Sequence, residues 1–226
     1  MKNCIMAATD PKSVEAEIFR NLRTNVLFSE VDTPLKVIAM TSTQPNEGKS
    51  VIIANYAVSL ASMGKQVLLM DGDLRKPSLA KLFEMKRGVG ITNALLGERS
   101  LAKCIQQTEV EHLYLMDCGP IPPNPAEIMG SSKMHHLIEE LREKFDYILI
   151  DTPPIGLVSD ALVLKEAVDG YILTVEIDRI KKEELAQIVE VIHNTGTFFL
   201  GTVVNKVPVK NGSYYGYYGA YGAYGE

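Results

Sequence analysis

The chain has 226 residues, of which 46% are hydrophobic and 23% charged, and its formal net charge is −5. This length suits one α/β domain with a substantial core, or at most two small ones, and the acidic balance excludes an overall basic field for nucleic acid. The three cysteines have no CxxC spacing and form no ligand pattern with the four histidines. We therefore expect neither a disulfide framework nor a zinc site, and a reducing cytosol as the natural compartment.

Neither a signal peptide nor a membrane span is expected from the sequence. Residues 1–10 have no long apolar stretch followed by a cleavage site. No window approaches the ~18 consecutive apolar residues that a membrane-spanning helix needs. We expect a cytoplasmic protein that another molecule must bring to a membrane if it works there.

The predicted elements alternate between helices and apolar strands. Apolar side chains near helical spacing predict a first helix over residues 13–28. A buried strand is predicted at 35–40, a helix at 51–63, and further strands at 67–70, 113–116, 145–150, 171–175 and 198–204. Helices are also predicted at 131–144, 159–167 and 181–195. This alternation of continuous apolar strands with helices favours a mostly parallel sheet covered by helices on both faces, a three-layer α/β/α fold.

The composition changes sharply near the end of the chain. Residues 211–226 are mostly glycine and tyrosine, and repeated glycine gives no reason to form a helix or a core strand. We interpret residues 1–210 as one domain and 211–226 as a flexible tail. Its tyrosines are Tyr214, Tyr215, Tyr217, Tyr218, Tyr221 and Tyr224.

A glycine-lysine-serine triplet at residues 48–50 stands between a predicted strand and a predicted helix, the context that a P-loop requires. Backbone N–H groups at a helix start bind phosphates, and the helix dipole adds to the attraction. We expect Lys49 to reach the β- and γ-phosphates and the Ser50 hydroxyl to bind Mg²⁺. The residues predicted to contact the nucleotide here are Glu47, Gly48, Lys49, Ser50 and Val51. Thr43 replaces the usual first glycine, and the alternative is a surface turn that only caps a helix.

Three aspartates stand where two other predicted strands end. Asp71 and Asp73 follow the strand at 67–70, and Asp151 follows the strand at 145–150. The carboxyl ends of parallel strands line the crevice where such sheets bind ligands. One carboxylate of the first pair can hold Mg²⁺ through water and the other can accept a proton from an attacking hydroxyl. The alternative is that these aspartates cap helices or turns.

The order of these motifs resembles that of the bacterial tyrosine kinases, and most of all the cytosolic kinase of capsule and exopolysaccharide systems. The motifs are the P-loop, residues 71–77 and residues 148–154, with further likeness at 90–92, 122–127 and 204–206. The resemblance implies that Lys49 and Ser50 form Walker A and Asp151 Walker B. It also implies that Asp71 is the base for the tyrosine hydroxyl and Asp73 organises Mg²⁺. Two further positions, Asn205 and Lys206, would border the adenine.

Two residues depart from the family pattern. Asn46 replaces a common glycine and Val51 a common threonine. Both are peripheral to the phosphate and metal contacts, so they bear on the conformation of the loop more than on activity.

Glu17, Arg20 and Arg23 repeat every third residue, which places them on one broad face of the first helix. In the resembled family this motif joins neighbouring subunits into a ring, so that the tail of one subunit enters the site of the next. The alternative is an exposed ion pair within the helix, worth only a few tenths of a kcal/mol.

The resemblance implies an autokinase that uses ATP with Mg²⁺, leaves ADP and phosphorylates its own tail. The expected phosphorylation sites are the six tail tyrosines. It further implies a transmembrane adaptor whose cytoplasmic tail activates the kinase at the inner face of the membrane, and a cognate tyrosine phosphatase. Two alternatives remain. A MinD/ParA-type ATPase would share the fold and aspartates, although its signature lysine is replaced here by Gln44. A nucleotide-gated, non-enzymatic interaction module would use the tail only as an adhesive segment.

Overall fold

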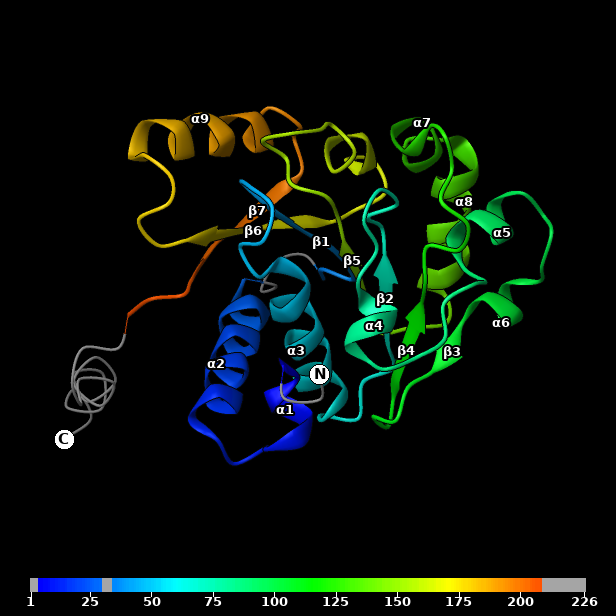
Figure 1. Ribbon diagram of the computed structural model, residues 1–226, viewed down its shortest axis with the longest axis horizontal. Helices are drawn as coiled ribbons and strands as arrows, with labels where there is room; N and C mark the ends of the chain where they lie inside the picture. The colour runs from blue at the N-terminus through cyan, green and yellow to red at the C-terminus, as the bar shows by residue number, and fades with distance from the viewer. Residues whose placement is uncertain (1–3, 30–33, 209–226) are drawn as a thin grey trace.

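The computed structural model describes residues 4–29 and 34–208, which form a single seven-stranded sheet with helices on both faces (Figure 1). The predicted tail at 211–226, with its six tyrosines, lies outside the described residues. The strands are β1 (Val37–Ser42), β2 (Val67–Asp71), β3 (Gln106–Gln107), β4 (Leu113–Met116), β5 (Tyr147–Asp151), β6 (Gly170–Glu176) and β7 (Phe198–Asn205).

The helices fall into long ones that the sequence pattern predicted and short ones that it did not. The long helices are α2 (Val14–Phe28), α3 (Lys49–Ala61), α8 (Ser132–Arg142) and α9 (Lys182–His193). The short ones are α1 (Met6–Thr9), α4 (Leu79–Leu82), α5 (Ile91–Leu95), α6 (Leu101–Cys104) and α7 (Pro125–Met129). Across the described ranges, no helix combines the length and apolarity needed to cross a bilayer.

The sheet has the strand order β3-β4-β2-β5-β1-β6-β7, and every pairing is parallel except that of β3 with β4. The predicted parallel three-layer fold is confirmed. Strand β5 lies between β1 and β2, so the ends of these three strands are neighbours even though more than 70 residues separate β2 from β5 in the chain. This order decides which side chains meet at the carboxyl edge of the sheet.

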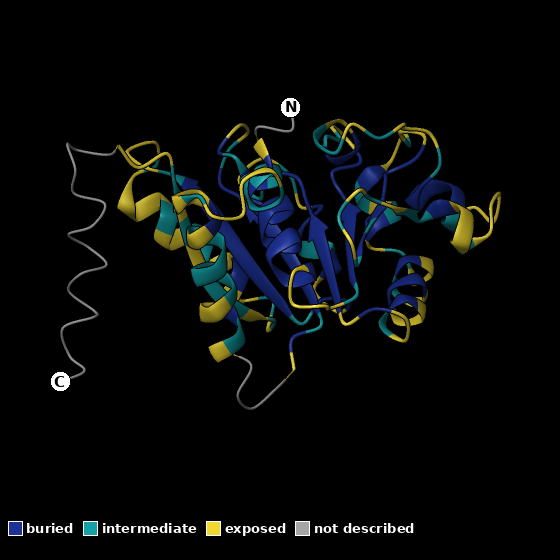
Figure 2. Cartoon of the chain, turned by 90° about the horizontal axis from the view of Figure 1, so that it is seen from below, coloured by how far each residue is buried: buried dark blue, intermediate teal, exposed yellow. Residues whose placement is uncertain are grey.

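Two apolar clusters cover the two faces of the sheet. One joins the strands to α5, α6, α7, α8 and α9, and the other joins them to α1, α2, α3 and α4. All the residues of β1, β2 and β5 are buried, as expected for strands covered on both sides. Figure 2 shows the central strands fully buried, whereas exposed residues lie on outward helix faces, in loops and along the edge strand β7.

The predicted helix over residues 159–167 is wrong: only a 3-10 helix, η2 (Leu162–Leu164), forms there. Nine residues are too few for helix propensity to decide the structure in water. Tertiary contacts decide it instead, because the Tyr171 hydroxyl donates to the carbonyl of Ala161 at 2.7 Å. The neighbouring side chain of Asp160 accepts a hydrogen bond from Arg75, which lies in the loop after β2, at 2.8 Å.

Asp169, just before β6, joins three segments at the amino-terminal edge of the sheet. Its Oδ2 accepts the backbone N–H groups of Lys36 and Val37 at 2.8 and 2.7 Å. Its two oxygens also accept both terminal nitrogens of Arg142, at 2.9 and 2.8 Å. One half-buried carboxylate therefore fixes the start of β1 and the end of α8.

Replacing Asp169 with alanine should lower the free energy of unfolding by about 2–4 kcal/mol, because it leaves two backbone donors and a partly buried guanidinium without an acceptor. Urea unfolding followed by circular dichroism measures this change. Glu140→Ala is the control, because Glu140 is exposed on α8 and forms an ion pair with the exposed Lys144 in the turn that follows the helix; its effect should stay within about 0.5 kcal/mol. Equal effects of the two variants would contradict the assigned role of Asp169.

Candidate active site

A cleft of about 670 Å³ lies at the carboxyl edge of the sheet, where β1, β2 and β5 end. Three loops line it: residues 45–51 after β1, residues 73–78 after β2, and residues 153–158 after β5. Lys81 and Leu82 of α4 complete the wall. The strand order thus brings together the three motifs that the sequence places far apart.

The loop after β1 has the backbone conformation of a phosphate-binding turn. Asn46 and Gly48 both lie in the left-handed region, with φ values of 65° and 93°. Asparagine tolerates this region better than most residues other than glycine, which explains how Asn46 stands where glycine is common. Helix α3 begins at Lys49, so Lys49 and Ser50 form its first turn and its free N–H groups face the cleft.

Glu47 shapes this loop from within. Its carboxylate is buried and accepts the Thr43 hydroxyl at 2.7 Å, the Gln44 N–H at 2.9 Å and the Glu176 N–H at 3.3 Å. Thr43, at the position of the usual first glycine, therefore serves as an internal donor. The pattern of the sequence alone did not indicate this role of Glu47, because a glutamate in a loop is ordinarily solvated.

Asn205 and Lys206, at the end of β7, hold the same loop from the outside. The Asn205 side-chain amide donates to the Glu47 carbonyl at 2.8 Å, and the Lys206 ammonium donates to the Asn46 carbonyl at 2.8 Å. A Cβ atom at Gly48 would lie 2.2 Å from the Asn205 amide nitrogen, so glycine is required there. Both residues lie at the loop, outside the cleft lining, and their predicted contact with adenine stays a prediction.

Lys49 and Asp151 form a buried ion pair at the floor of the site. The Lys49 ammonium lies 2.6 Å from Oδ1 of Asp151, and the Asp151 side chain is 0% exposed. Burial raises the pKa of Asp151, and the charge of Lys49 opposes this shift. Oδ2 of Asp151 is buried with no hydrogen-bond partner among the described residues. One oxygen of this carboxylate therefore remains for a ligand.

Asp71 and Asp73 occupy different places because β2 ends at Asp71. Oδ2 of Asp71 accepts the N–H groups of Ser78 and Leu79, both at 2.8 Å, so Asp71 does cap the next helix. Burial and the negative charge of Asp151 raise the pKa of Asp71 to about 7, against these backbone hydrogen bonds. Asp71 lies beneath the cleft wall, whereas Asp73 lines the cleft and accepts the Lys76 N–H at 2.9 Å.

The residues present fit Mg²⁺, which prefers carboxylate and hydroxyl oxygens and usually binds one or two carboxylates together with substrate phosphates. Ser50 and Asp73 line the cleft, and Asp151 has an unpartnered oxygen at its floor. In the part of the chain that the structure describes, no three Asp, Glu, His or Cys side chains form a metal cage. A nucleotide would therefore have to supply part of the coordination.

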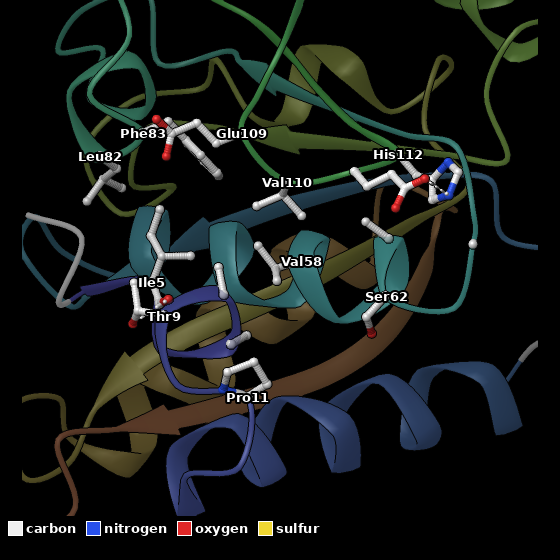
Figure 3. Close-up of a pocket in the computed structure, with 15 residues that line it drawn as sticks. Ile5, Thr9, Pro11, Val58, Ser62, Leu82, Phe83, Glu109, Val110 and His112 are labelled. Carbon is white, nitrogen blue, oxygen red and sulfur yellow. Dashed lines mark hydrogen bonds and ion pairs between the residues drawn. The ribbon is translucent and has the colours of Figure 1, made fainter.

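A second hollow, of about 590 Å³, lies between α1, α3 and the loop before β4 (Figure 3). Its walls are mainly apolar, with Ile5, Val58, Phe83 and Val110 among them. Within the described residues its lining contains no lysine or arginine. It therefore lacks the cations that a nucleotide phosphate requires.

The motif on α2 is divided between two environments. Glu17 and Arg20 form an exposed ion pair, with an Nε–Oε2 distance of 2.6 Å. Arg23 instead reaches across to α3, where it donates to the carbonyl of Ser59 and, at 3.4 Å, to the hydroxyl of Ser62. The sequence spacing placed all three on one face, but only the structure shows that Arg23 joins two helices of the same chain.

Comparison with known proteins agrees with this geometry. A family model described as an AAA domain matches residues 35–198. Tyrosine-protein kinase YwqD of Bacillus subtilis is 40% identical over 96% of this chain and 91% of its own. Tyrosine-protein kinase CpsD of Streptococcus agalactiae serotype Ia is 39% identical over 88% and 85%. The crystal structure of the chimerical protein CapA2B2 has a TM-score of 0.88 and 34% identity, covering 92% of this chain and 91% of its own.

The fold and the cleft define a P-loop nucleotide-binding domain. Within that class, the chain belongs to the bacterial tyrosine kinase family. The MinD alternative is a more distant relation: MinD of Pyrococcus horikoshii, complexed with Mg-ADP, has a TM-score of 0.66 and 25% identity over 78% of this chain and 72% of its own.

The raised pKa of Asp71 predicts how the stability of the protein without nucleotide and Mg²⁺ depends on pH. Because the folded state disfavours the ionised carboxylate, Asp71 lowers stability progressively as the pH rises from 3.8 to about 7. Asp71→Asn removes this charge and keeps an oxygen acceptor for Ser78 and Leu79. Its gain in stability over wild type should therefore be larger at pH 8 than at pH 4.5, as measured by urea unfolding in EDTA. An equal gain at both values would contradict the prediction, and Glu140→Gln controls for the loss of one exposed charge.

Proposed function

We propose that this protein is an ATP-dependent tyrosine autokinase whose acceptors are Tyr214, Tyr215, Tyr217, Tyr218, Tyr221 and Tyr224. The observation that carries the proposal is the convergence of Lys49, Ser50, Asp73 and the Asp151 carboxylate on one cleft at the end of the sheet. Membership of the tyrosine kinase family supports protein tyrosine as the acceptor. The glycines between the tail tyrosines would allow each side chain to enter a site.

In the proposed mechanism, Lys49 leaves its ion pair with Asp151 and binds the β- and γ-phosphates instead. The N–H groups at the start of α3 hold the remaining phosphate oxygens. Ser50, Asp73 and Asp151 would hold Mg²⁺, which when bound neutralises phosphate charge. Asp71 is the proposed acceptor of the phenol proton. A pKa of about 7 brings this carboxyl closer to the phenol, whose pKa is ~10, than an ordinary carboxyl would be.

Incubation with γ-labelled ATP and Mg²⁺ tests the activity. Label should appear on tail tyrosines, located by phosphosite mapping, and Lys49→Met should reduce it at least about 100-fold because the phosphates lose their buried cation. Lys144→Met is the matched control, since Lys144 is an exposed lysine in the turn after α8 that pairs with Glu140, and this variant should retain full labelling. Free phosphate without labelled protein would instead support an ATPase, and neither product would support a non-enzymatic module.

We also propose that the motif on α2 joins subunits into a ring in which the tail of one subunit is phosphorylated by the next. The exposed Glu17–Arg20 pair is available for contacts between subunits, and Arg23 anchors α2 on α3 beneath it. Each added phosphate brings about −1.5 to −2 charges. Several such groups on an acidic chain would repel one another and loosen the ring.

Sedimentation of the protein before and after dephosphorylation tests this proposal. The dephosphorylated form should sediment as a larger assembly than the phosphorylated form, and Arg20→Ala should sediment as the smaller species in both states. Glu15→Ala, on the same helix but outside the motif, should behave as wild type. Equal masses for all forms would exclude the ring.

The same proposal places the kinase in capsule or exopolysaccharide synthesis and export, in the cytoplasm at the inner face of the membrane. A transmembrane adaptor would recruit it there and activate it through a cytoplasmic tail, and a cognate tyrosine phosphatase would reset the phosphorylated tail. The resemblance to cytosolic capsule kinases supports the proposal of these two partners, the adaptor and the phosphatase. Weak phosphorylation by the isolated protein that rises when an adaptor tail peptide is added would support the adaptor.

A further inference from the structure

Arg75 stands out in the cleft wall because a buried carboxylate fixes it. Its Nε donates to Oδ2 of Asp160 at 2.8 Å and its Nη2 donates to Oδ1 at 3.0 Å. The Asp160 side chain is 1% exposed, whereas that of Arg75 is 45% exposed and lines the cleft. This two-point contact joins the loop after β2 to the segment after β5, which together with the P-loop form the three walls of the cleft.

The Arg75 guanidinium keeps unused donors. An arginine has five N–H donors, and the contact with Asp160 uses two of them. The remaining donors, on Nη1 and Nη2, make no hydrogen bond within the described residues. A guanidinium held in a fixed orientation loses little further entropy when it binds a second anion, and its geometry matches the oxygens of a phosphoryl group.

The other charged residues of the cleft do not supply a free, fixed cation for the γ-phosphate, and Arg75 can supply one. Lys49 faces Asp151 at 2.6 Å, so the P-loop cation is already balanced by a carboxylate. The other cations of the lining, Lys76 and Lys81, form no ion pair with any residue that the structure describes, and both are exposed, flexible side chains. Among the described residues that line the cleft, Arg75 is the one arginine and the one cation besides Lys49 with a buried carboxylate partner.

We propose that Arg75 binds the γ-phosphoryl group of ATP during its transfer, and that Asp160 is the positioning residue that holds Arg75 for this contact. In the transfer, a bond forms between the tyrosine oxygen and the γ-phosphorus, and the bond from that phosphorus to the β–γ bridging oxygen breaks. ADP leaves, and the phenol proton passes to an aspartate carboxylate. Lys49 and Arg75 together neutralise the negative charge on the transferred phosphoryl group. This inference rests on the proposed kinase function but is also testable by binding alone.

The segment around Asp160 agrees with this role. The sequence predicts a regular helix there, yet only the three residues of η2 form one. The backbone runs so that Asp160 is buried and meets the guanidinium from another loop with both oxygens. Burying a carboxylate is costly unless it is paired, so the arrangement depends on Arg75 being present.

Measurements of nucleotide affinity test the contact between Arg75 and the γ-phosphate without requiring phosphoryl transfer. Isothermal titration with MgADP and with the Mg²⁺ complex of the non-hydrolysable analogue AMP-PNP compares ligands that differ in the γ-group. Arg75→Ala should weaken AMP-PNP binding about tenfold and change ADP binding less than twofold, because the variant loses a charge-assisted contact to the γ-group, which ADP lacks. Arg75→Lys should recover part of the loss, and Asp160→Asn should fall between wild type and Arg75→Ala.

Turnover gives the second readout. Removing one donor that stabilises transition-state charge costs about 10²–10³ in rate, so Arg75→Ala should lower kcat for tyrosine phosphorylation by about that factor with KM for ATP raised about tenfold. The matched control is Arg87→Ala. Arg87 is an equally exposed arginine that lies 3.8 Å from another buried aspartate, Asp117, but it is not part of the cleft lining.

The outcomes distinguish this inference from the proposed function. If Arg75→Ala weakens the binding of ADP and AMP-PNP equally, or changes neither affinity, Arg75 does not contact the γ-group and the inference is overturned. If wild type transfers no phosphate to tyrosine but still shows the selective loss of AMP-PNP affinity, the kinase proposal fails and the γ-phosphate contact stands. Circular dichroism at the assay temperature checks that each variant is folded. Should Arg75→Ala be unfolded, the same comparison is made with Arg75→Gln, which keeps part of the side-chain volume.

Discussion

The ion pair between Lys49 and Asp151 is the contact on which the site depends. It joins the P-loop after β1 to the end of β5 at 2.6 Å, and both side chains are buried. A charge so deeply buried is stable only with a close partner, so the two loops must hold their positions. Ligand binding at this cleft therefore means exchanging one partner of Lys49 for another, which couples the affinity for phosphate to the charge of Asp151.

The surrounding loops hold the P-loop rigid from both sides. Glu47 supports it from inside, and Asn205 and Lys206 bind its carbonyl groups from β7. Because Glu176 accepts both Lys206 and Arg179, the end of β6 belongs to the same network. A phosphate-binding loop fixed in advance loses little entropy when a ligand arrives.

The aspartates of the site lie at different depths below the surface of the cleft. Asp73 lies in the wall where a metal and nucleotide can reach it, whereas Asp71 lies beneath, held by the start of α4. Burial raises the pKa of Asp71 because it disfavours the charged form of the carboxyl, and repulsion from the nearby Asp151 carboxylate raises it further. Environment, rather than residue type, therefore gives neighbouring aspartates different chemical properties.

The sequence by itself determined the parallel sheet, the P-loop, and the presence of aspartates at the strand ends, because these follow from local apolar patterns and from residue spacing. Only the tertiary structure decided which aspartate lines the cleft, that Arg23 bonds to α3 rather than standing free, and that Asp160 meets Arg75. These contacts join residues distant along the chain, and their partners are chosen by strand order. Local propensity favoured a helix at 159–167, but the burial of Asp160 and the hydrogen bond to Ala161 outweighed it.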